Sequence, residues 1–332
     1  MEPVYLENWS SGALREKIRL ARSLLASCSL CPRQCSVNRL KGEVGVCGQK
    51  ARAKVARALL HFGEEPPISG VRGAGTVFFT GCALHCLFCQ NYQISQEGLG
   101  EELETEDLAR LFLQLQHQGC HNLDLVSPTP HLPFIFEALE RAIPQGLKIP
   151  LVYNTHGYLL KETLDLLEGV VDIYLPDMKY GEGPAADLLS RAGDYPQYNQ
   201  TAVKEMFRQV GVLKTDDQGL AFRGLLVRHL VLPAGRSHSG RVLQGLADLS
   251  PDIPISLMAQ YRPGHKAFQV PEIGRPLERR EYEAVVARAE ELGFEEIFIQ
   301  DLDSSAVYNP DFTREDPFSQ GKQAGPELEK IR

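Results

Sequence analysis

Short apolar runs alternate along the chain with stretches whose apolar residues recur at helical spacing. Six runs have the length of buried strands, at residues 76–80, 123–127, 149–154, 172–177, 225–232 and 255–260, and a weaker seventh covers 296–300. Helical spacing predicts helices near 106–117, 133–142, 161–167 and 280–292, with Thr105 as the cap of the first. Strands that alternate with helices in this way form βαβ units around a parallel sheet.

The number of strands limits the architecture. Six or seven units fall short of the eight that close a complete barrel, so we predict an α/β fold, a partial (β/α)6-type TIM barrel. We assign residues 71–300 to this barrel, 1–70 to a small Cys-rich N-terminal metal-binding segment, and 301–332 to a polar tail that forms an extended or poorly ordered arm. Residues 181–199, with their glycines and prolines, are predicted to form a long loop that recognises substrate.

Composition and charge narrow the class of protein. The chain has 332 residues, 43% of them hydrophobic, which is enough for one large core. No apolar run reaches the roughly 18 residues of a membrane span, and the N-terminus lacks the basic start and apolar stretch of a signal peptide. The net charge of −8 argues against a nucleic-acid-binding surface. We therefore expect a soluble, cytoplasmic protein without a membrane partner.

Three cysteines follow directly on the first predicted strand. Cys82, Cys86 and Cys89 are spaced C-x3-C-x2-C on one loop, and such thiolates can hold three irons of a four-iron cube. The loop offers no fourth cysteine, which leaves one iron open to bind another molecule. Because an electron-carrying cluster normally uses four thiolates, this spacing favours an enzyme.

Four more cysteines lie upstream, at Cys28, Cys31, Cys35 and Cys47, among prolines and glycines that supply tight turns. A stretch this short has no hydrophobic core of its own, which indicates metal-assisted folding. The ligands fit a second, fully ligated iron–sulfur cluster or a zinc ion, although the spacing lacks the paired C-x2-C ends of a zinc ribbon. Unmetallated thiols are the third alternative, and Cys120 is left over as a packed thiol.

Polar residues gather where the predicted strands end. The loops in question are 82–89, 127–129, 154–157, 177–179, 233–235 and 260–262. Parallel barrels carry their chemistry at the carboxyl ends of the strands, so we expect these loops to open on one mouth. Taken singly, each residue has a structural alternative: Asp177 and Lys179 as a surface pair, and Asn154 as a turn former.

These motifs resemble those of a known family. Cys82-x3-Cys86-x2-Cys89, with Phe88 before the last cysteine, looks like the signature of the radical S-adenosylmethionine (SAM) superfamily. The continuation Gln90-Asn91, the turn at 154–157 and the Asp177-x-Lys179 motif are similar to the pyruvate formate-lyase activating enzyme branch. With Cys-Pro-Arg-x-Cys at 31–35 and His-Phe-Gly-Glu-Glu-Pro-Pro at 61–67, the pattern resembles iron–sulfur homologues of that activating enzyme over residues 25–300.

The resemblance implies cofactors and a reaction. The cofactors are a [4Fe-4S] cluster and SAM, whose amino and carboxylate groups the open iron would chelate. An electron from the reduced cluster would cleave the sulfonium, giving methionine and a 5′-deoxyadenosyl radical that abstracts a substrate hydrogen. A flavodoxin- or ferredoxin-type protein is implied as the electron donor, and a protein is a candidate substrate.

The resemblance also implies roles for single residues. The residues implied to bind SAM are Phe88, Asn91, Ser127, Asn154 and Thr155, and those implied in catalysis are Asp177, Lys179 and Arg228. Arg228 and Arg262 could each grip a carboxylate bidentately, or form a structural ion pair instead. One departure is that Ser127-Pro128-Thr129-Pro130 stands where many radical SAM enzymes carry the Gly-Gly-Glu turn that holds the methionine amine.

Three functions remain open at this point. The first is hydrogen abstraction that installs a glycyl radical on a partner protein, and the second is modification of a small molecule or a peptide. The third belongs to another class, a non-catalytic iron–sulfur electron carrier or sensor. The third function needs a fourth protein ligand near residues 82–89, and the local sequence offers no cysteine for it.

Overall fold

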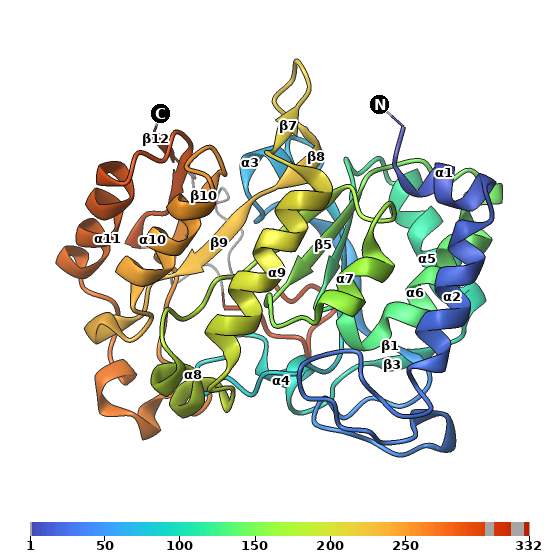
Figure 1. Cartoon of the computed structure of the whole chain (residues 1–332), viewed down its shortest axis with the longest axis horizontal. Coiled ribbons are helices and arrows are strands. Elements are labelled where there is room, and N and C mark those ends of the chain that lie inside the picture. The colour runs from blue at the N-terminus through green and yellow to red at the C-terminus, as the bar shows by residue number, and fades with distance from the viewer. Residues whose placement is uncertain (1, 303–308, 320–328, 332) are drawn as a thin grey trace.

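A computed structural model describes residues 2–302, 309–319 and 329–331 as an α/β fold with a mostly parallel sheet (Figure 1). The parallel strands of the larger sheet, each paired with the next, are β2 (Ala74–Phe79), β4 (Leu123–Val126), β5 (Leu151–Thr155), β6 (Ile173–Pro176) and β8 (Ala221–Leu225). A second sheet continues the series with β9 (Val227–Leu230), β10 (Ile255–Met258) and β11 (Ile297–Ile299), and β12 (Glu329–Ile331) runs antiparallel at its edge. The predicted α/β partial barrel is confirmed.

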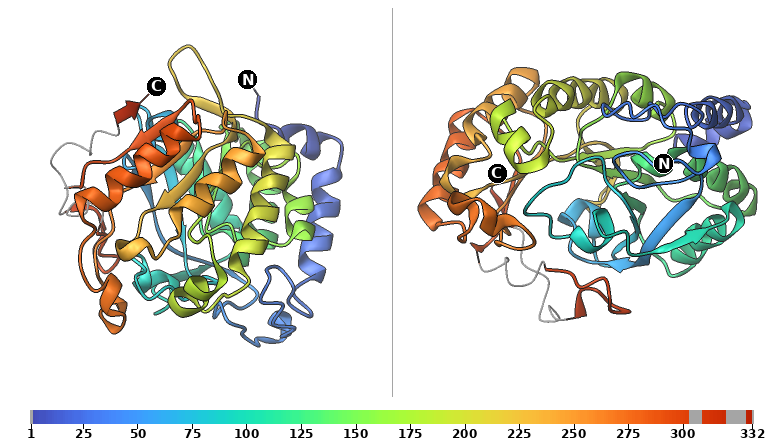
Figure 2. Two further views of the ribbon diagram at one scale, coloured as in Figure 1. Left: turned by 60° about the vertical axis from the view of Figure 1, so that its left-hand side comes forward. Right: turned by 90° about the horizontal axis from the view of Figure 1, so that it is seen from below.

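The longer helices form an outer arc around the strands (Figure 2, right). They are α5 (Thr105–His117), α6 (Leu132–Ala142), α7 (Lys161–Leu167), α9 (Tyr195–Val210), α10 (Ser239–Leu249) and α11 (Arg279–Glu291). Shorter elements are α3 (Pro66–Ser69), α4 (Tyr92–Ser95), α8 (Gly183–Ser190) and β7 (Lys214–Thr215), with 3-10 turns at 39–41, 129–131, 143–145, 233–235, 267–269 and 271–273. In the part of the chain that is described, no helix is both long and apolar enough to cross a membrane.

The N-terminal region adds elements that the apolar runs did not predict. β1 (Ala53–His61) pairs antiparallel with β2 and carries β3 (Glu101–Leu103) on its other side. The helix α2 (Ala13–Ser23) packs beside α6, where Arg22 forms a 2.5 Å ion pair with Glu137, and α1 (Tyr5–Ser10) packs against α2. The division into 1–70, 71–300 and 301–332 stays a prediction, and β1 and β2 pair across its first boundary.

Several details differ from the sequence-based prediction. The expected loop at 181–199 contains α8 and the start of α9, so it is a helical excursion. The expected strand at 225–232 is divided at Leu226, because β8 pairs with β6 whereas β9 pairs with β10. Thr105 is the first residue of α5 rather than its cap, and its hydroxyl donates to Glu137 at 3.0 Å.

The tail is packed where it is described. Residues 303–308, 320–328 and 332, part of the predicted extended arm, lie outside the described residues. Residues 309–319 instead lie against the sheet: Phe312 is fully buried, 5.3 Å from the ring of Phe78, and the ring of Phe318 is 4.4 Å from that of His61. These apolar contacts place this part of the tail beside β1 and β2.

Candidate active site

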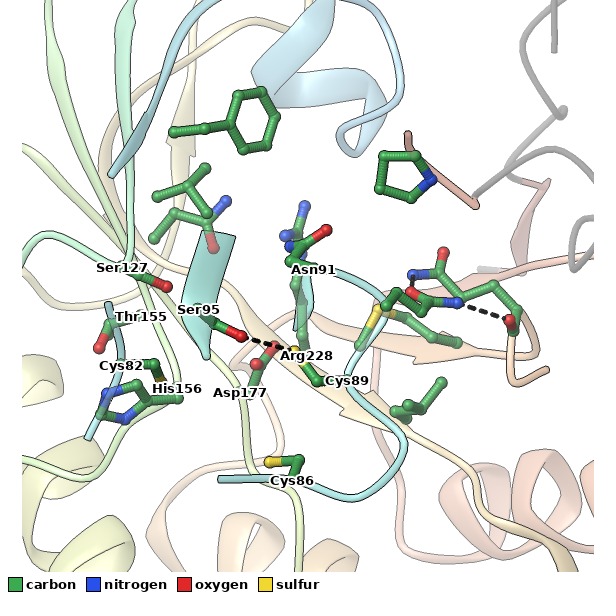
Figure 3. A pocket seen from close by; sticks show the side chains of 18 of the residues that line it. Cys82, Cys86, Cys89, Asn91, Ser95, Ser127, Thr155, His156, Asp177 and Arg228 are labelled. Atoms are coloured by element: carbon green, nitrogen blue, oxygen red, sulfur yellow. Dashed lines mark hydrogen bonds between the residues drawn. The ribbon is translucent and has the colours of Figure 1, made fainter. Parts of the chain in front are cut away.

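One cavity at the carboxyl ends of the strands gathers the residues singled out in the sequence (Figure 3). Its lining includes Cys82, Cys86, Phe88, Cys89, Asn91, Ser127, Asn154, Thr155, Asp177, Lys179 and Arg228. About 1300 Å³ of space inside it is free of protein atoms, counted with the open solvent at its mouth. Arg262 does not line the cavity and its side chain is exposed, so the expected second arginine is not part of the site.

The three cysteines of the loop are free thiols, buried or nearly so. The Ser190 hydroxyl donates to Cys86 Sγ at 2.9 Å, the Leu84 amide donates to Cys82 Sγ at 3.4 Å, and Ser95 Oγ lies 3.2 Å from Cys89 Sγ. Burial raises the pKa of each thiol, that of Cys89 to about 11. Deprotonation therefore needs a partner with positive charge, such as a metal.

The spacing of these sulfur atoms is also informative. Among the described residues, Asp165, Glu168 and Glu205 are the one group of three whose potential metal-binding atoms lie within 4.8 Å of one another. The three sulfurs are therefore more widely spaced than ligands of a single ion, where metal–sulfur bonds of about 2.3 Å bring sulfurs within about 4 Å. Wide spacing suits a cube in which each thiolate binds a different iron.

The loop takes its shape from a glycine and from two neighbouring segments. Gly81 has a φ of +88°, which favours glycine, and its amide donates to the carbonyl of Ile94 at 2.9 Å. The Leu87 amide donates to the carbonyl of Leu189 in α8 at 2.9 Å. The loop is thus fixed between α4 and α8, which explains how three thiols come to face one space.

Asp177 and Lys179 form an ion pair inside the cavity, at 2.5 Å, with side chains only 20% and 17% exposed. Burial would lower the pKa of Lys179, but Asp177 and the neighbouring Cys86 outweigh it and raise that pKa overall. The backbone of this loop is held by α9, because the Tyr195 hydroxyl and the Asn199 amide both donate to the Asp177 carbonyl, at 2.9 and 2.8 Å. The result is a fixed cation beside the three thiols.

The residues expected to bind SAM come from the ends of β4 and β5 and from the cysteine loop. Ser127 has a left-handed φ of +56°, and its amide donates to the carbonyl of Asn154 at 2.9 Å. Non-glycine residues in this conformation cluster at functional sites. Thr155 accepts from the amide of Gly157 at 3.3 Å, and Phe88 lies edge-on to Tyr180 and Tyr261.

Arg228 is held by two carboxylates that line the same cavity. Its Nε donates to Glu65 at 2.8 Å, and its Nη2 contacts both Glu65, at 2.5 Å, and Glu64. All three side chains are nearly buried. The structural ion pair, which the sequence left open for Arg228, is the arrangement present.

A buried acid lies beneath this ion pair. Asp124 is fully buried, and burial together with the neighbouring Glu64 raises its pKa well above the ordinary value. Its Oδ2 accepts from Thr76 at 3.2 Å and from Asn154 at 3.5 Å. Burial and Glu64 both disfavour a negative charge on Asp124, beneath the ion pair of Arg228.

Several lining residues were missed as site residues. Glu64 and Glu65 stood in the 61–67 motif, but no spacing rule linked that motif to strand ends far along the chain. His156 lines the cavity with its pKa lowered to about 4 by burial, so its imidazole is neutral. Pro310 and Phe318 of the tail also line it, and no sequence signal connects them to the cysteines.

The second cysteine group lies beside the first (Figure 2, right). His85, within the cysteine loop, donates from Nε2 to the carbonyl of Val46 at 3.0 Å, and Arg33 donates to the carbonyl of Ala83 at 2.9 Å. Cys28 is buried, while Cys31, Cys35 and Cys47 are partly buried. Cys120 is buried apart from both groups, as predicted for a packed thiol, and contacts the Leu115 carbonyl at 3.2 Å.

Residues 76–198 match the sequence profile of the radical SAM superfamily. This part of the chain is therefore similar to the radical SAM superfamily. An uncharacterized protein of Methanocaldococcus jannaschii, MJ0674, is 29% identical over 306 residues, which cover 88% of this chain and 83% of that protein.

Three solved structures also match part of this chain. The crystal structure of Streptococcus suis SuiB matches 68% of this chain and 49% of its own, at 12% identity and a TM-score of 0.46. The structure of SuiB bound to the precursor peptide SuiA matches 74% of this chain and 52% of its own, at 11% identity and a TM-score of 0.47. A radical SAM methyltransferase from Sphaerobacter thermophilus matches 70% of this chain and 69% of its own, at 15% identity and a TM-score of 0.46. The chain thus spans about half the length of SuiB.

The residues present fit the cluster that the superfamily implies. The cysteine loop brings three thiols, buried or nearly so, to one cavity, with serine hydroxyls on two of the sulfurs. Of the eight cysteines, all within the described residues, these three alone line the cavity. Cys82, Cys86 and Cys89 would therefore hold a [4Fe-4S] cluster, and one iron would keep no cysteine ligand.

Proposed function

We propose that this protein is a radical SAM enzyme that cleaves SAM reductively and abstracts a hydrogen atom from a substrate. When bound, the cluster supplies the electron that breaks the sulfonium bond, and the open iron is where SAM attaches. The observation that carries the proposal is that three cysteines, and only three among the described residues, meet the polar strand ends in one cavity. A carrier cluster would need a fourth protein ligand there.

In this proposal the protein orients SAM and excludes water. Phe88 lies in the cysteine loop as an apolar wall for the adenine, and Ser127, Asn154 and Thr155 present hydroxyl and amide groups to the ribose and the methionine end. Lys179, held by Asp177, provides a fixed positive charge for the carboxylate of SAM. Asn91, next in the lining, completes the SAM contacts.

In the same proposal, the acidic pair Glu64 and Glu65 takes the place of the Gly-Gly-Glu turn that is missing after β4. Both carboxylates line the cavity, and the single cation of Arg228 faces the two of them. The remaining negative charge suits a cationic group such as the methionine amine. We therefore assign Arg228 to positioning these carboxylates rather than to gripping a substrate.

Glycyl-radical activation of a partner protein is the finer function that we propose, on the resemblance of the Asp177-x-Lys179 motif and of the 154–157 turn. Modification of a small molecule or a peptide is the alternative. A low-potential, one-electron protein of the flavodoxin or ferredoxin type would supply the electron.

The test is an anaerobic assay for 5′-deoxyadenosine after reconstitution with iron and sulfide, addition of SAM and reduction by dithionite. We expect product from the full chain and none from the Cys86→Ala variant. A loaded wild-type protein that forms no 5′-deoxyadenosine, with or without candidate substrates, would overturn the proposal in favour of an electron carrier. Hydrogen transfer from a glycine-bearing protein or from a peptide, followed with deuterated substrates, would separate the two finer alternatives.

A further inference from the structure

We propose that Cys28, Cys31, Cys35 and Cys47 hold a second iron–sulfur cluster, ligated by all four thiolates and balanced by the buried cation of Arg39. This site does not depend on the function proposed for the three-cysteine loop. It would differ from the first cluster in having no iron open to SAM.

The fold of residues 24–52 brings the four thiols together without a strand or an α-helix. The amide of Cys28 donates to the carbonyl of Val37 at 2.9 Å, and the Ser36 amide donates to the carbonyl of Cys28 at 3.0 Å. The Gln34 amide donates to the carbonyl of Cys31 at 3.0 Å, and Gly45, two residues before Cys47, lies against the side chain of Cys35. The four sulfurs therefore share one neighbourhood.

The loop is shaped closely around these sulfurs. Gly45 has no room for a side chain, because a Cβ there would lie 2.7 Å from Cys35 Sγ. The amide of Val46 donates to the same sulfur at 3.4 Å, as backbone amides do to metal-bound thiolates. Gln34 and Ser36, on either side of Cys35, both adopt left-handed conformations with φ of +40° and +56°. A strained backbone of this kind indicates a site rather than a surface loop.

The spacing of the sulfurs distinguishes a cluster from zinc. Tetrahedral zinc with bonds of about 2.3 Å would draw its four sulfurs to within about 4 Å of one another. No three of these sulfurs, all of them in the described part of the chain, lie within 4.8 Å of one another. The thiols of the radical SAM loop share this wide spacing, and the superfamily that their loop resembles implies a four-iron cube. In each group, at least one pair of sulfurs thus lies farther apart than the ligands of a zinc ion would, which favours a cluster in the second group.

Arg39 is the second, independent observation. Its side chain is 1% exposed, its Nε and Nη2 donate to the Lys50 carbonyl at 3.2 and 2.6 Å, and its Nη1 has no partner among the described residues. No described carboxylate pairs with it, although a buried cation is costly unless an anion balances it. The Arg39 amide donates to the carbonyl of Leu25, three residues before Cys28, at 2.9 Å, and its side chain binds Lys50, three residues after Cys47, which places the cation within the cysteine loop. Four thiolates around a cluster carry a net negative charge, which would balance the positive charge of Arg39.

The experiment measures metal in the Cys82→Ala/Cys86→Ala/Cys89→Ala variant of the full chain, reconstituted anaerobically with iron and sulfide. We expect it to keep about half the iron and sulfide of the wild type, about four irons per chain. After reduction, its electron paramagnetic resonance signal should be unchanged by SAM. The complementary variant with Cys28, Cys31, Cys35 and Cys47 changed to serine should keep the other half, and the signal that SAM alters.

Zinc in place of iron in the triple variant as purified, or no metal above background in a variant with wild-type circular dichroism, would overturn the proposal. If the serine variant fails to fold, the triple variant still decides, because its N-terminal region is intact. Arg39→Gln separates charge from packing: it should lose iron from the second site only, and Arg39→Lys should recover part of that iron.

Discussion

The two cysteine groups of this protein lie side by side and differ in one ligand. The radical SAM loop has three thiols in a cavity that also holds polar strand ends, and the N-terminal group has four in a loop that closes around them. Three thiolates leave one iron of a four-iron cluster without a protein ligand, so that a reactant can bind there, whereas four thiolates leave no such iron. The comparison indicates that the chemistry of each group follows from the number of its ligands.

Each group also has a buried cation, and these cations differ in their partners. Lys179 is paired with Asp177 at 2.5 Å beside the three thiols. Arg39 has no carboxylate partner among the described residues, and its neighbour is Cys47. At the three-cysteine group, the charged side chains line the cavity and can contact a ligand. At the four-cysteine group, the charges are balanced within the protein.

The largest expected effect comes from removing one cysteine of the three-cysteine group, which we call the open group, as opposed to the closed group of four cysteines. Cys86→Ala should abolish 5′-deoxyadenosine formation, a loss of at least about 1000-fold, because the cluster that activates SAM loses its anchor. Iron analysis of the same sample should still show about half of the wild-type content. Complete loss of iron with retained fold would contradict the separation of the two groups.

Removing a ligand of the closed group should act on stability first. Cys47→Ser should lose the second half of the iron and lower the free energy of unfolding by more than about 2 kcal/mol, since metal binding is coupled to folding of this segment. Thermal denaturation monitored by circular dichroism measures this effect. Cys120→Ser, a buried cysteine outside both groups, is the control and should keep all the iron.

The contact between the groups can be broken at Gly81. Its φ is +88°, and a Cβ there would lie 2.6 Å from the carbonyl oxygen of Cys47 and also clash with the amide of Gln49. Gly81→Ala should therefore cost about 2–3 kcal/mol and reduce iron in both groups. Gly119→Ala is the matched control, because Gly119 has a φ of +90° with no atom within 4 Å of its Cβ. Equal effects of the two substitutions would show that the close contact is unimportant.

The cation of the open site can be tested alone. Lys179→Gln should slow 5′-deoxyadenosine formation about 10- to 100-fold through weaker binding of the SAM carboxylate, with the iron content unchanged. Lys161→Gln removes an exposed lysine that pairs with Asp165 and should leave the rate unchanged. A loss of iron in Lys179→Gln would instead assign this lysine to holding the cluster.

The smallest effect concerns the acid under the open site. Burial and Glu64 raise the pKa of Asp124 in the folded protein, so its contribution to stability is full below its unfolded pKa and is lost as pH rises through the folded value. The neutral amide introduced by Asp124→Asn would mimic the protonated acid at every pH. The variant should match the wild type near pH 4 and become more stable by about 1 kcal/mol at high pH, as measured by melting temperature. The opposite trend would mean that Asp124 is ionised.

The sequence predicted the parts of this protein that depend on local pattern. Apolar runs located the strands β2, β4, β5, β6, β10 and β11, and the cysteine spacing located the cluster loop. The prediction of a loop at 181–199 was wrong because Pro184 and Pro196 were interpreted as loop residues, whereas they lie in the first turns of α8 and α9. Proline is common at this position, because the first amides of a helix have no hydrogen-bond partner within the helix and their loss costs little.

Long-range contacts could not be predicted in this way. Glu64 and Glu65 reach the cavity because β1 pairs with β2, and Arg228 reaches them from β9, more than 160 residues later in the chain. Phe312 and Phe318 pack on β2 through tertiary contacts alone. A single sequence gives periodicity and spacing, but it does not show which distant segments pair.

The most direct test of the central claim is the electron paramagnetic resonance spectrum of the reduced, fully reconstituted wild-type protein, recorded with and without SAM. One open and one closed cluster predict that SAM alters about half of the signal and leaves the rest unchanged. A spectrum that SAM does not alter, in a protein with its full iron content, would contradict the claim that the three-cysteine group is open to SAM.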